Sequence, residues 1–317
     1  MGLAMLGAVS QGILWGVMVL GVFITYKLLD IADLTVDGSF ALGGSVCAVL
    51  VVSGVDPVLA IFAAMLAGMI AGAVTGFLHT VFEIPAILAG ILTQIALWSV
   101  NLRIMGKSNT PLLRVDTLFS SVTDATGLPQ NVASIIVGLI FAILIIVALY
   151  WFFGTEIGSA CRATGNNEAM VRALGVDTKV TKMIALTLSN GLVGLSGGLI
   201  CESQGYADIG MGTGAIVIGL AAIVIGEVLG RLTPGKLRSF GSRLSAAVVG
   251  SVVYFLIRAI VLQLGMDAND MKLISAAIVA LALCIPVVWE KYQLRRAYAR
   301  SAKAAPATPA ANSEGGR

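Results

Sequence analysis

The sequence has little charge. Of its 317 residues, 12% are Asp, Glu, Lys or Arg, about half the share that is usual in soluble domains. Hydrophobic residues make up 58%. Water therefore cannot be the main solvent of this chain, which excludes the soluble globular classes. The net charge of +3 is small, and we expect no nucleic-acid partner.

Cysteine and histidine are scarce as well. Cys47, Cys161, Cys201 and Cys284 lie far apart, with neither paired spacing nor a neighbouring histidine to suggest a metal site. We interpret them as small apolar side chains. His79 stands at the end of an apolar run, where an interfacial side chain is the expected role and a proton relay the alternative. We predict no catalytic residue, metal or cofactor in this chain.

Long apolar runs are abundant. A hydrocarbon core of about 30 Å needs about 20 residues of helix. Because a spanning segment must satisfy its own backbone hydrogen bonds, these runs predict an all-α, polytopic transmembrane helical bundle of about 8–10 spans. No cleavable signal peptide is expected, because no basic region precedes the first run. The nine expected spans are Leu3–Tyr26, Gly38–Val52, Val58–Thr80, Ile84–Arg103, Val132–Phe153, Met183–Cys201, Gly214–Gly230, Leu244–Leu264 and Leu273–Trp289.

The basic residues indicate which ends of the spans are cytoplasmic, since Lys and Arg concentrate on that side. They gather in the loop after Phe153, in the loop after Gly230 and in the tail. Because successive loops alternate between the two sides of the membrane, residues 27–37 and 79–83 are then expected on the cytoplasmic side. The amino terminus and the long loop 104–130 are expected on the outer side. That loop is a local exception to the rule, because it and its flank carry Arg103, Lys107 and Arg114. The turns between the basic regions hold one basic residue, Lys272, with Glu202, Asp208, Asp267 and Asp270.

Two regions follow from this pattern. Residues 1–290 form the transmembrane domain, and residues 291–317 form a basic cytoplasmic tail whose Ala- and Pro-rich end should be disordered. Within the domain, glycines repeat every fourth residue, which lets helix backbones approach closely in lipid. These ridges are Gly68 with Gly72 and Gly76, Gly12 with Gly16, and Gly194 with Gly198.

Three aspartates crowd the stretch KLLDIADLTVDGSFALGG, residues 27–44. We expect Asp30, Asp33 and Asp37 to lie where the chain re-enters the membrane on the cytoplasmic side. Asp37 can cap the helix that begins at Gly38. A solvated acidic face is therefore the predicted role, with a substrate site or an ATPase contact as alternatives.

Two segments look like nucleotide-binding phosphate loops, but each lacks a residue that such a loop requires. GRLTPGK, residues 230–236, has the spacing of such a loop, but Leu237 stands where a Ser or Thr hydroxyl must reach magnesium, and a span rather than a strand precedes it. GKS at 106–108 has Asn101 in place of the first glycine. If this protein uses ATP, another chain hydrolyses it.

The segment 158–182, GSACRATGNNEAMVRALGVDTKVTK, predicts a short helix. Asn166 can cap it, Glu168 lies near the positive end of its dipole, and Gly175 closes the far end. Glu168 and Arg172 are four residues apart and can pair. One small apolar face is formed by Ala169, Met170, Ala173 and Leu174.

This short helix must pack against a surface. About eight residues at 1.5 Å each give roughly 12 Å, too short to span a membrane or to be stable alone. From periodicity alone, the surface is the lipid headgroups or the cytoplasmic ends of the chain's own bundle.

The same segment resembles the coupling segment of bacterial ABC-type permeases of the branched-chain amino acid and ribose class. In that family a glycine, an arginine, A-x-G-x-N and A-x-x-x-G precede a span, and the resemblance covers most of Leu6 to Pro286. GLAAIVIGEVLGR is similar to an alanine-rich Gly-Gly signature, and DLTVDGSFALGG resembles a subset with uncharacterised chains and tryptophan and tyrosine transport systems. The matching coupling positions are Gly158, Arg162, Ala163, Gly165, Asn167, Ala169, Ala173 and Gly175.

The resemblance implies a permease subunit of an ATP-driven importer in the bacterial cytoplasmic (inner) membrane. In that family the short helix docks on a cytoplasmic ATPase subunit, which binds the ATP. An extracytoplasmic binding protein delivers the solute, and a second permease copy or a similar chain completes the path. A small solute, an amino acid and more narrowly an aromatic one, is implied. The implied coupling residues are Arg162, Gly165, Asn166, Asn167, Glu168, Ala169, Met170, Arg172, Ala173, Leu174 and Gly175.

Polar residues inside the expected spans are further candidates. Arg258 lies about six residues below an outer helix end, so it is a functional candidate whose stem can also snorkel to the surface. Glu202 is its candidate partner. Gln94, Asn101 and Asn190 can line a solute path or bond helices together, and helix bonding is the simpler role for each.

Two other classes stay open. An ion-coupled secondary transporter should show inverted repeats, broken helices and carboxylates near mid-depth, and the sequence indicates neither a convincing repeat nor a buried acid. A membrane enzyme needs clustered catalytic groups, against which one histidine and scattered cysteines argue.

Overall fold

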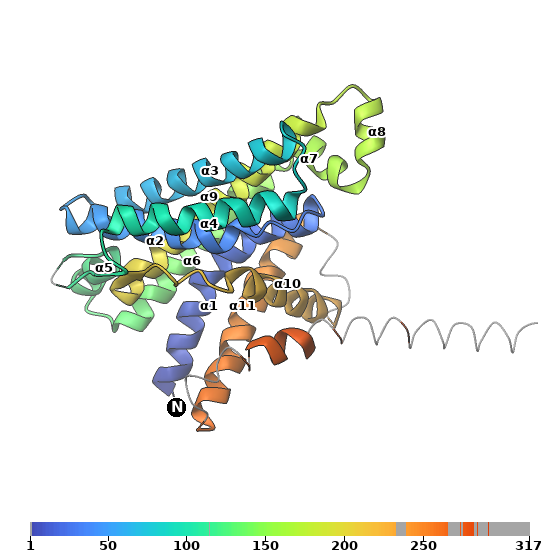
Figure 1. Ribbon diagram of the computed structural model, residues 1–317. Coiled ribbons are helices and arrows are strands. Elements are labelled where there is room, and N and C mark those ends of the chain that lie inside the picture. The colour runs from blue at the N-terminus through green and yellow to red at the C-terminus, as the bar shows by residue number, and fades with distance from the viewer. Residues whose placement is uncertain are drawn as a thin grey trace, which may run out of the picture.

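The computed structural model describes residues 2–113, 115–232, 239–265, 273, 275–281, 284 and 291. Its elements form a helical bundle (Figure 1). In chain order they are α1 (Gly2–Phe23), the π-helical turn η1 (Ile24–Leu28), α2 (Thr35–Val52), α3 (Pro57–Thr80), α4 (Ala86–Met105), β1 (Asn109–Pro111), α5 (Leu118–Thr126), α6 (Gln130–Phe152), α7 (Glu156–Asn166), α8 (Glu168–Ala173), α9 (Thr178–Gln204), β2 (Tyr206–Asp208), α10 (Ala215–Leu232) and α11 (Phe240–Gln263).

Seven described helices are long and apolar enough to cross a membrane. They are α1 with η1, α2, α3, α4, α6, α9 and α11. The predicted all-α polytopic bundle is therefore confirmed. Each of these helices coincides with an expected span to within five residues at each end. Of the last expected span, Leu273–Trp289, the structure describes residues 273, 275–281 and 284, and these are helical. Of the tail 291–317 it describes residue 291 alone.

The expected span at Gly214–Gly230 is different from the others. Its helix, α10, is apolar over Ala215–Gly230, and the residues directly after Leu232 lie outside the described part of the chain. The preceding segment 205–214 consists of β2 and turns, and Gly212 packs against the backbone of Asp37 in the first turn of α2. The chain thus runs back along α2 without helix before α10 begins. Non-helical backbone at this depth is tolerated only where protein buries it or where it lines a cavity.

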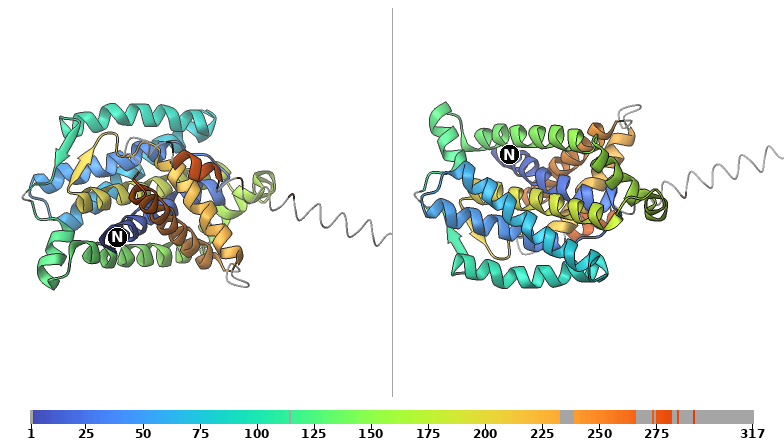
Figure 2. Two further views of the ribbon diagram at one scale, coloured as in Figure 1. Left: turned by 90° about the horizontal axis from the view of Figure 1, so that it is seen from below. Right: turned by 90° about the horizontal axis from the view of Figure 1, so that it is seen from above.

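α9 is the central helix. It packs against α1, α2 and α3, and like α1 it is buried along most of its length, whereas α4 is mostly exposed. Two opposite views, from below and from above, show α4 and α6 at opposite edges, with α1 and α9 between them (Figure 2). A displacement of α9 would therefore reach most of the bundle.

The glycine ridges allow this close packing. A Cβ at Gly68 would overlap the backbone carbonyl of Asn190, and one at Gly72 would overlap that of Leu186. A Cβ at Gly12 would overlap the backbone of Val252 in α11, and one at Gly16 would overlap the side chain of Val248. The predicted architectural role of these ridges is confirmed, because in lipid it is packing rather than water expulsion that holds helices together.

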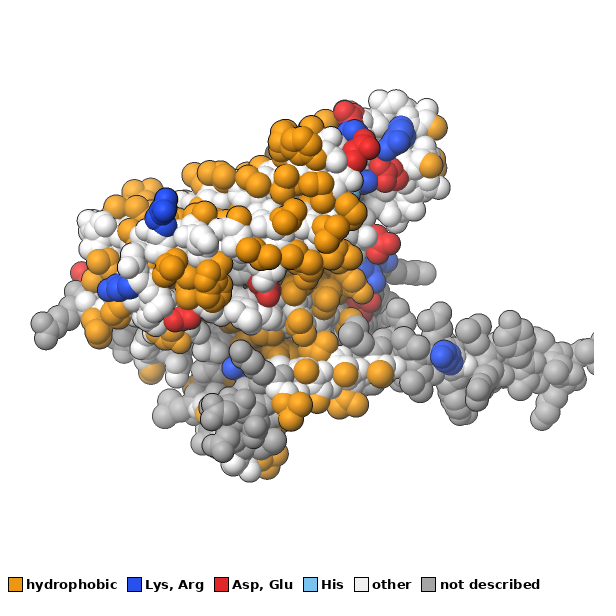
Figure 3. Space-filling view, in the orientation of Figure 1, with side chains coloured by type: hydrophobic (Ala, Val, Ile, Leu, Met, Phe, Trp, Pro, Cys, Tyr) orange, Lys and Arg blue, Asp and Glu red, His pale blue; other side chains and the backbone are white. Residues whose placement is uncertain are grey.

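The described parts of the loops predicted to be cytoplasmic lie at one end of the bundle. Lys179 at the start of α9 pairs with Glu83 in the α3–α4 turn at 2.9 Å, and Lys27 pairs with Glu227 near the end of α10 at 2.7 Å. Charged side chains gather at the end that carries α8, while apolar side chains cover the sides of the bundle (Figure 3).

The opposite end holds three elements that the sequence did not predict. β1 and β2 form a short antiparallel pair, with Thr110 opposite Ala207, and α5 lies in the long loop before α6. This pairing ties the loop 104–130 to the segment 205–214, so both leave the bundle at the same end.

Candidate functional site: the α7–α8 segment and a cavity

The α7–α8 segment, residues 156–177, begins with a helix that the sequence did not predict. Thr155 caps α7, its hydroxyl accepting a hydrogen bond from the N–H of Gly158 at 3.3 Å. A Cβ at Gly158 would overlap the carbonyl of Phe152, and one at Gly165 would overlap that of Leu28. Two of the predicted glycines therefore seat α7 directly on the ends of α6 and η1.

Cys161 in α7 is buried, and its thiol donates to the carbonyl of Thr181 at 3.5 Å. Burial raises the pKa of this thiol to about 11, so it stays protonated at neutral pH. This environment agrees with the predicted role of the cysteine as a small apolar side chain.

The predicted short helix is α8, with a corrected cap. The carboxamide oxygen of Asn167, not that of Asn166, accepts a hydrogen bond from the N–H of Met170 at 3.0 Å. Asn166 is instead the last residue of α7. Because a second helix occupies the residues before Asn167, α8 has six residues rather than about eight. Gly175 follows with φ +85°, as the predicted helix end requires.

Glu168 is the centre of an ion cluster. Its Oε1 lies 3.0 Å from Arg172, as the spacing predicted, and its Oε2 lies 2.7 Å from Lys182 on α9. The Thr178 hydroxyl also donates to Oε1 at 3.1 Å. The hydrogen bond from Lys182 is the main reason that the pKa of Glu168 is lowered. A six-residue helix with no stability of its own is thus fastened to the central helix.

The apolar face of α8 is uncovered in the described chain. Val171 is 2% exposed and anchors the helix, whereas Met170 is 50% and Leu174 74% exposed. Ala169 and Ala173 are exposed beside them. The ends of the bundle therefore do not cover this face; they were one of the two surfaces expected from periodicity alone, the other being the lipid headgroups. α8 projects from the end of the bundle (Figure 1).

Arg162 points elsewhere. Its guanidinium carbon lies 5.5 Å from the centre of the Phe240 ring at the start of α11, a cation–π distance. The side chain is half-buried. Arg162 therefore joins α7 to α11 and does not belong to the exposed face of α8.

The predicted solvated acidic face is wrong for Asp33. This residue is 2% exposed, and its carboxylate accepts hydrogen bonds from the N–H of Thr35 at 2.9 Å and from the Asn190 carboxamide at 2.6 Å. Burial raises the pKa of Asp33 above its ordinary value. Only Asp30 of the three aspartates is exposed. The expectation that the chain has no buried acid is corrected as well.

Asp37 does not cap its own helix, because α2 begins two residues earlier, at Thr35. Its two carboxylate oxygens instead accept hydrogen bonds from the N–H groups of Gly214 at 2.9 Å and Ile216 at 3.0 Å. Asp37 therefore caps α10, a helix far away in the sequence, and holds the end of the segment 205–214.

The three intramembrane amides lie between helices. Asn190 is fully buried and also accepts from the Ser39 hydroxyl at 2.7 Å. Asn101 is buried and donates to the carbonyl of Gly38 at 3.4 Å. Gln94 is half-buried, with its backbone against Gly38. None of the three lines the two large cavities described below.

Arg258 and Glu202 do not pair. Glu202 is 1% exposed and accepts hydrogen bonds from the N–H of Leu118 at 2.8 Å and the Cys47 thiol at 3.3 Å. The Arg258 guanidinium lies over the Phe255 ring, 5.8 Å from its centre.

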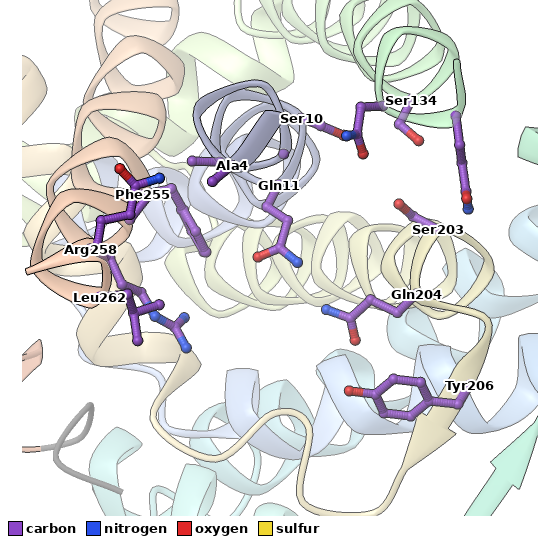
Figure 4. Close-up of a pocket in the computed structure, with 16 residues that line it drawn as sticks. Ala4, Ser10, Gln11, Ser134, Ser203, Gln204, Tyr206, Phe255, Arg258 and Leu262 are labelled. Atoms are coloured by element: carbon purple, nitrogen blue, oxygen red, sulfur yellow. The ribbon is translucent and has the colours of Figure 1, made fainter. Parts of the chain in front are cut away.

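Arg258 lines two adjacent cavities of about 630 and 840 Å³ at the end opposite α8. Both are also lined by Gln11, Gln204 and Tyr206, and these four side chains surround one open space (Figure 4). The volumes lie in the range of small-molecule sites. The larger cavity is also lined by Trp15, Phe40 and Asp208 and by the segment 205–214.

Among these lining residues, the sequence singled out only Arg258 as a site candidate. Gln11 and Trp15 lie on an ordinary apolar helix, so nothing local marks them. The signal for the segment 205–214 was the alternation of Gly210, Gly212 and Gly214, since glycine-rich interruptions mark broken spans.

A family model for the branched-chain amino acid transport system permease component matches residues 4–284. The chain therefore belongs to this permease family, whose members are components of ABC-type transport systems.

The relatives agree with this assignment. The chain is 37% identical to a tyrosine transport system permease protein of Clostridioides difficile over 86% of this chain and 88% of the relative. It is 32% identical to an uncharacterised Rickettsia prowazekii protein over 87% and 95% of the two chains. It is 30% identical to a ribose import permease protein of Escherichia coli over 52% and 50%. No solved structure matches this chain.

Proposed function

We propose that this chain is the membrane subunit of an ATP-driven importer in the bacterial inner membrane, and that α8 docks on a separate cytoplasmic ATPase. The observation that carries the proposal is the exposed apolar face of α8, which the ion cluster of Glu168 holds at the end of the bundle. An amphipathic helix with an uncovered apolar face fits a groove on a partner protein.

The contacts of the α7–α8 segment supply a route for motion. Glu168 joins α8 to α9 through Lys182, Gly165 sets α7 against η1, and Arg162 joins α7 to α11. Closure of ATPase subunits would therefore push on the central helix α9, on η1 and on α11 together. Such a rigid-body movement is the means by which packed bundles change access.

The solute is proposed to be an amino acid, and more narrowly an aromatic one, delivered by an extracytoplasmic binding protein. Similarity to a tyrosine transport system permease supports this choice, and similarity to a ribose import permease over half of the chain is the reason to test a sugar beside it. A second copy of the chain or a similar subunit would complete the path.

The substitution Ala173→Asp tests the docking surface. It places a charge in the middle of the exposed apolar face, so we expect copurification of the ATPase and ATP-driven uptake to fall at least ten-fold, while the chain itself stays monodisperse. Burial of one unpaired carboxylate at an interface is sufficient for that loss.

Ala125→Asp is the matched control, because Ala125 is an exposed alanine in α5 at the opposite end of the bundle. Its copurification should equal that of the unsubstituted chain. Equal copurification by the Ala173→Asp variant would refute the proposal.

An ion-coupled secondary transporter is the second candidate, since Asp33 and Glu202 are buried acids and α10 begins inside the bundle. Both acids, however, have their hydrogen-bonding partners within the protein. Uptake into proteoliposomes that ran on an ion gradient without any ATPase would favour this candidate.

A further inference from the structure

The larger cavity is lined by two opposite charges that do not neutralise each other. Arg258 comes from α11 and Asp208 from the end of β2. Both residues are described, and no ion pair within 4.0 Å joins them. A cation and an anion that are held apart at the wall of an otherwise apolar bundle raise the free energy of the folded state unless another charged or polar group pairs with each of them.

Asp208 is held in place by its own loop. Its Oδ1 accepts a hydrogen bond from the N–H of Gly210 at 2.8 Å, and its Oδ2 lies 3.5 Å from the Asn109 carboxamide. An ionised carboxylate can accept about four hydrogen bonds, so capacity for a cationic donor remains. The side chain is half-buried, which strengthens such a contact relative to one in open water.

Aromatic rings form the apolar wall of the same cavity. Trp15 and Phe40 stack with ring centres 4.7 Å apart, and Tyr206 lines the cavity from β2. Gln11 and Gln204 add neutral donors and acceptors (Figure 4). An apolar wall with a few polar groups is the usual composition of a small-molecule site.

We propose that this cavity binds an aromatic α-amino acid as its zwitterion. Arg258 takes the carboxylate, Asp208 takes the ammonium group, and the ring lies between Trp15, which Phe40 backs, and Tyr206. This inference rests on the proposed function, because it assumes that the solute passes through this chain. It adds the residues that select the solute. A neutral sugar would leave both charges without an ionic partner among the described residues.

Equilibrium binding to the purified full-length chain tests the inference without any ATPase. The probes are L-tyrosine, tyramine, which lacks the carboxylate, 3-(4-hydroxyphenyl)propionate, which lacks the ammonium group, and ribose. We expect saturable binding of L-tyrosine that is about ten- to a hundred-fold tighter than that of either truncated probe, the usual size of one charge-assisted contact. Ribose should not compete.

The variants Arg258→Gln and Asp208→Asn show which side chain binds the carboxylate and which binds the ammonium group of the ligand. Arg258→Gln should abolish the preference for tyrosine over tyramine and keep the preference over the propionate, and Asp208→Asn should do the reverse. A merely unfolded variant would lose both preferences together. Arg103→Gln is the control, because Arg103 is exposed on α4 and does not line the cavity.

Lack of saturable tyrosine binding by the monodisperse chain, or unchanged preferences in both variants, would overturn the inference. ATP-driven transport could still proceed in either case, which would leave the proposed function in place. Conversely, tyrosine binding with the expected preferences in a chain that binds no ATPase would support the site and refute the proposed coupling.

Discussion

At the scale of single residues, Glu168 has the largest share in holding α8. It bonds Arg172 within α8, and Lys182 and Thr178 on α9. The pKa of Glu168 is lowered, chiefly by Lys182. A carboxyl whose pKa is depressed in the folded state stabilises that state at pH above its ordinary pKa, about 4.3, and the stabilisation is lost as pH falls through the folded pKa.

The attachment of α8 should therefore be insensitive to pH from 8 to 5 and fail below about pH 4. A spin label on Leu174→Cys, in a Cys284→Ser background, should keep one mobility over the first range and become more mobile below it. Glu168→Gln should give the label this higher mobility throughout. Glu156→Gln, an exposed residue of α7, is the control, and a label whose mobility is unchanged by Glu168→Gln would contradict this role.

At the scale of elements, α10 and the turn segment before it depend on α2. The Asp37 carboxylate accepts from the N–H groups of Gly214 and Ile216, and Gly212 packs on the backbone of Asp37. The first turn of α2 thus fixes the first turn of α10. It also fixes the segment 205–214, which forms part of the wall of the larger cavity.

Removal of this cap should loosen the start of α10. A lost cap costs about 1 kcal/mol, or about five-fold in a local opening equilibrium, so Asp37→Ala should speed amide hydrogen exchange over 212–218 by about that factor. Asp56→Ala removes the matching cap of α3, in which Asp56 accepts from the N–H of Val58 at 2.8 Å, and should leave 212–218 unchanged. Equal exchange in both variants would contradict the linkage.

The spans and the Glu168–Arg172 pair could be predicted because their signals are local: apolar length, helical spacing and a closing glycine. The roles of Asp33 and Asp37 could not be, because their partners lie 157 and 177 residues away. An Asp beside the start of a helix has the same local sequence pattern whether its carboxylate accepts hydrogen bonds from water or from another helix. For the same reason, only Arg258 among the cavity residues was a candidate.

At the scale of the whole molecule, the two sites lie at opposite ends of one helix. α9 begins at Thr178, beside the ion cluster, and ends at Gln204, which lines the cavity. At 1.5 Å per residue its 27 residues span about 40 Å. The helix that α8 would push is thus the helix whose far end lines the proposed solute site.

The most direct test of the central claim is photo-crosslinking from Leu174, replaced by a benzophenone amino acid, in inside-out membrane vesicles that also contain the proposed ATPase subunit. The account predicts an adduct between the two chains, lost in Ala173→Asp and absent when the same group replaces Ala125. An adduct from position 125 but none from position 174, or labelling of position 174 only from the outer face, would contradict it.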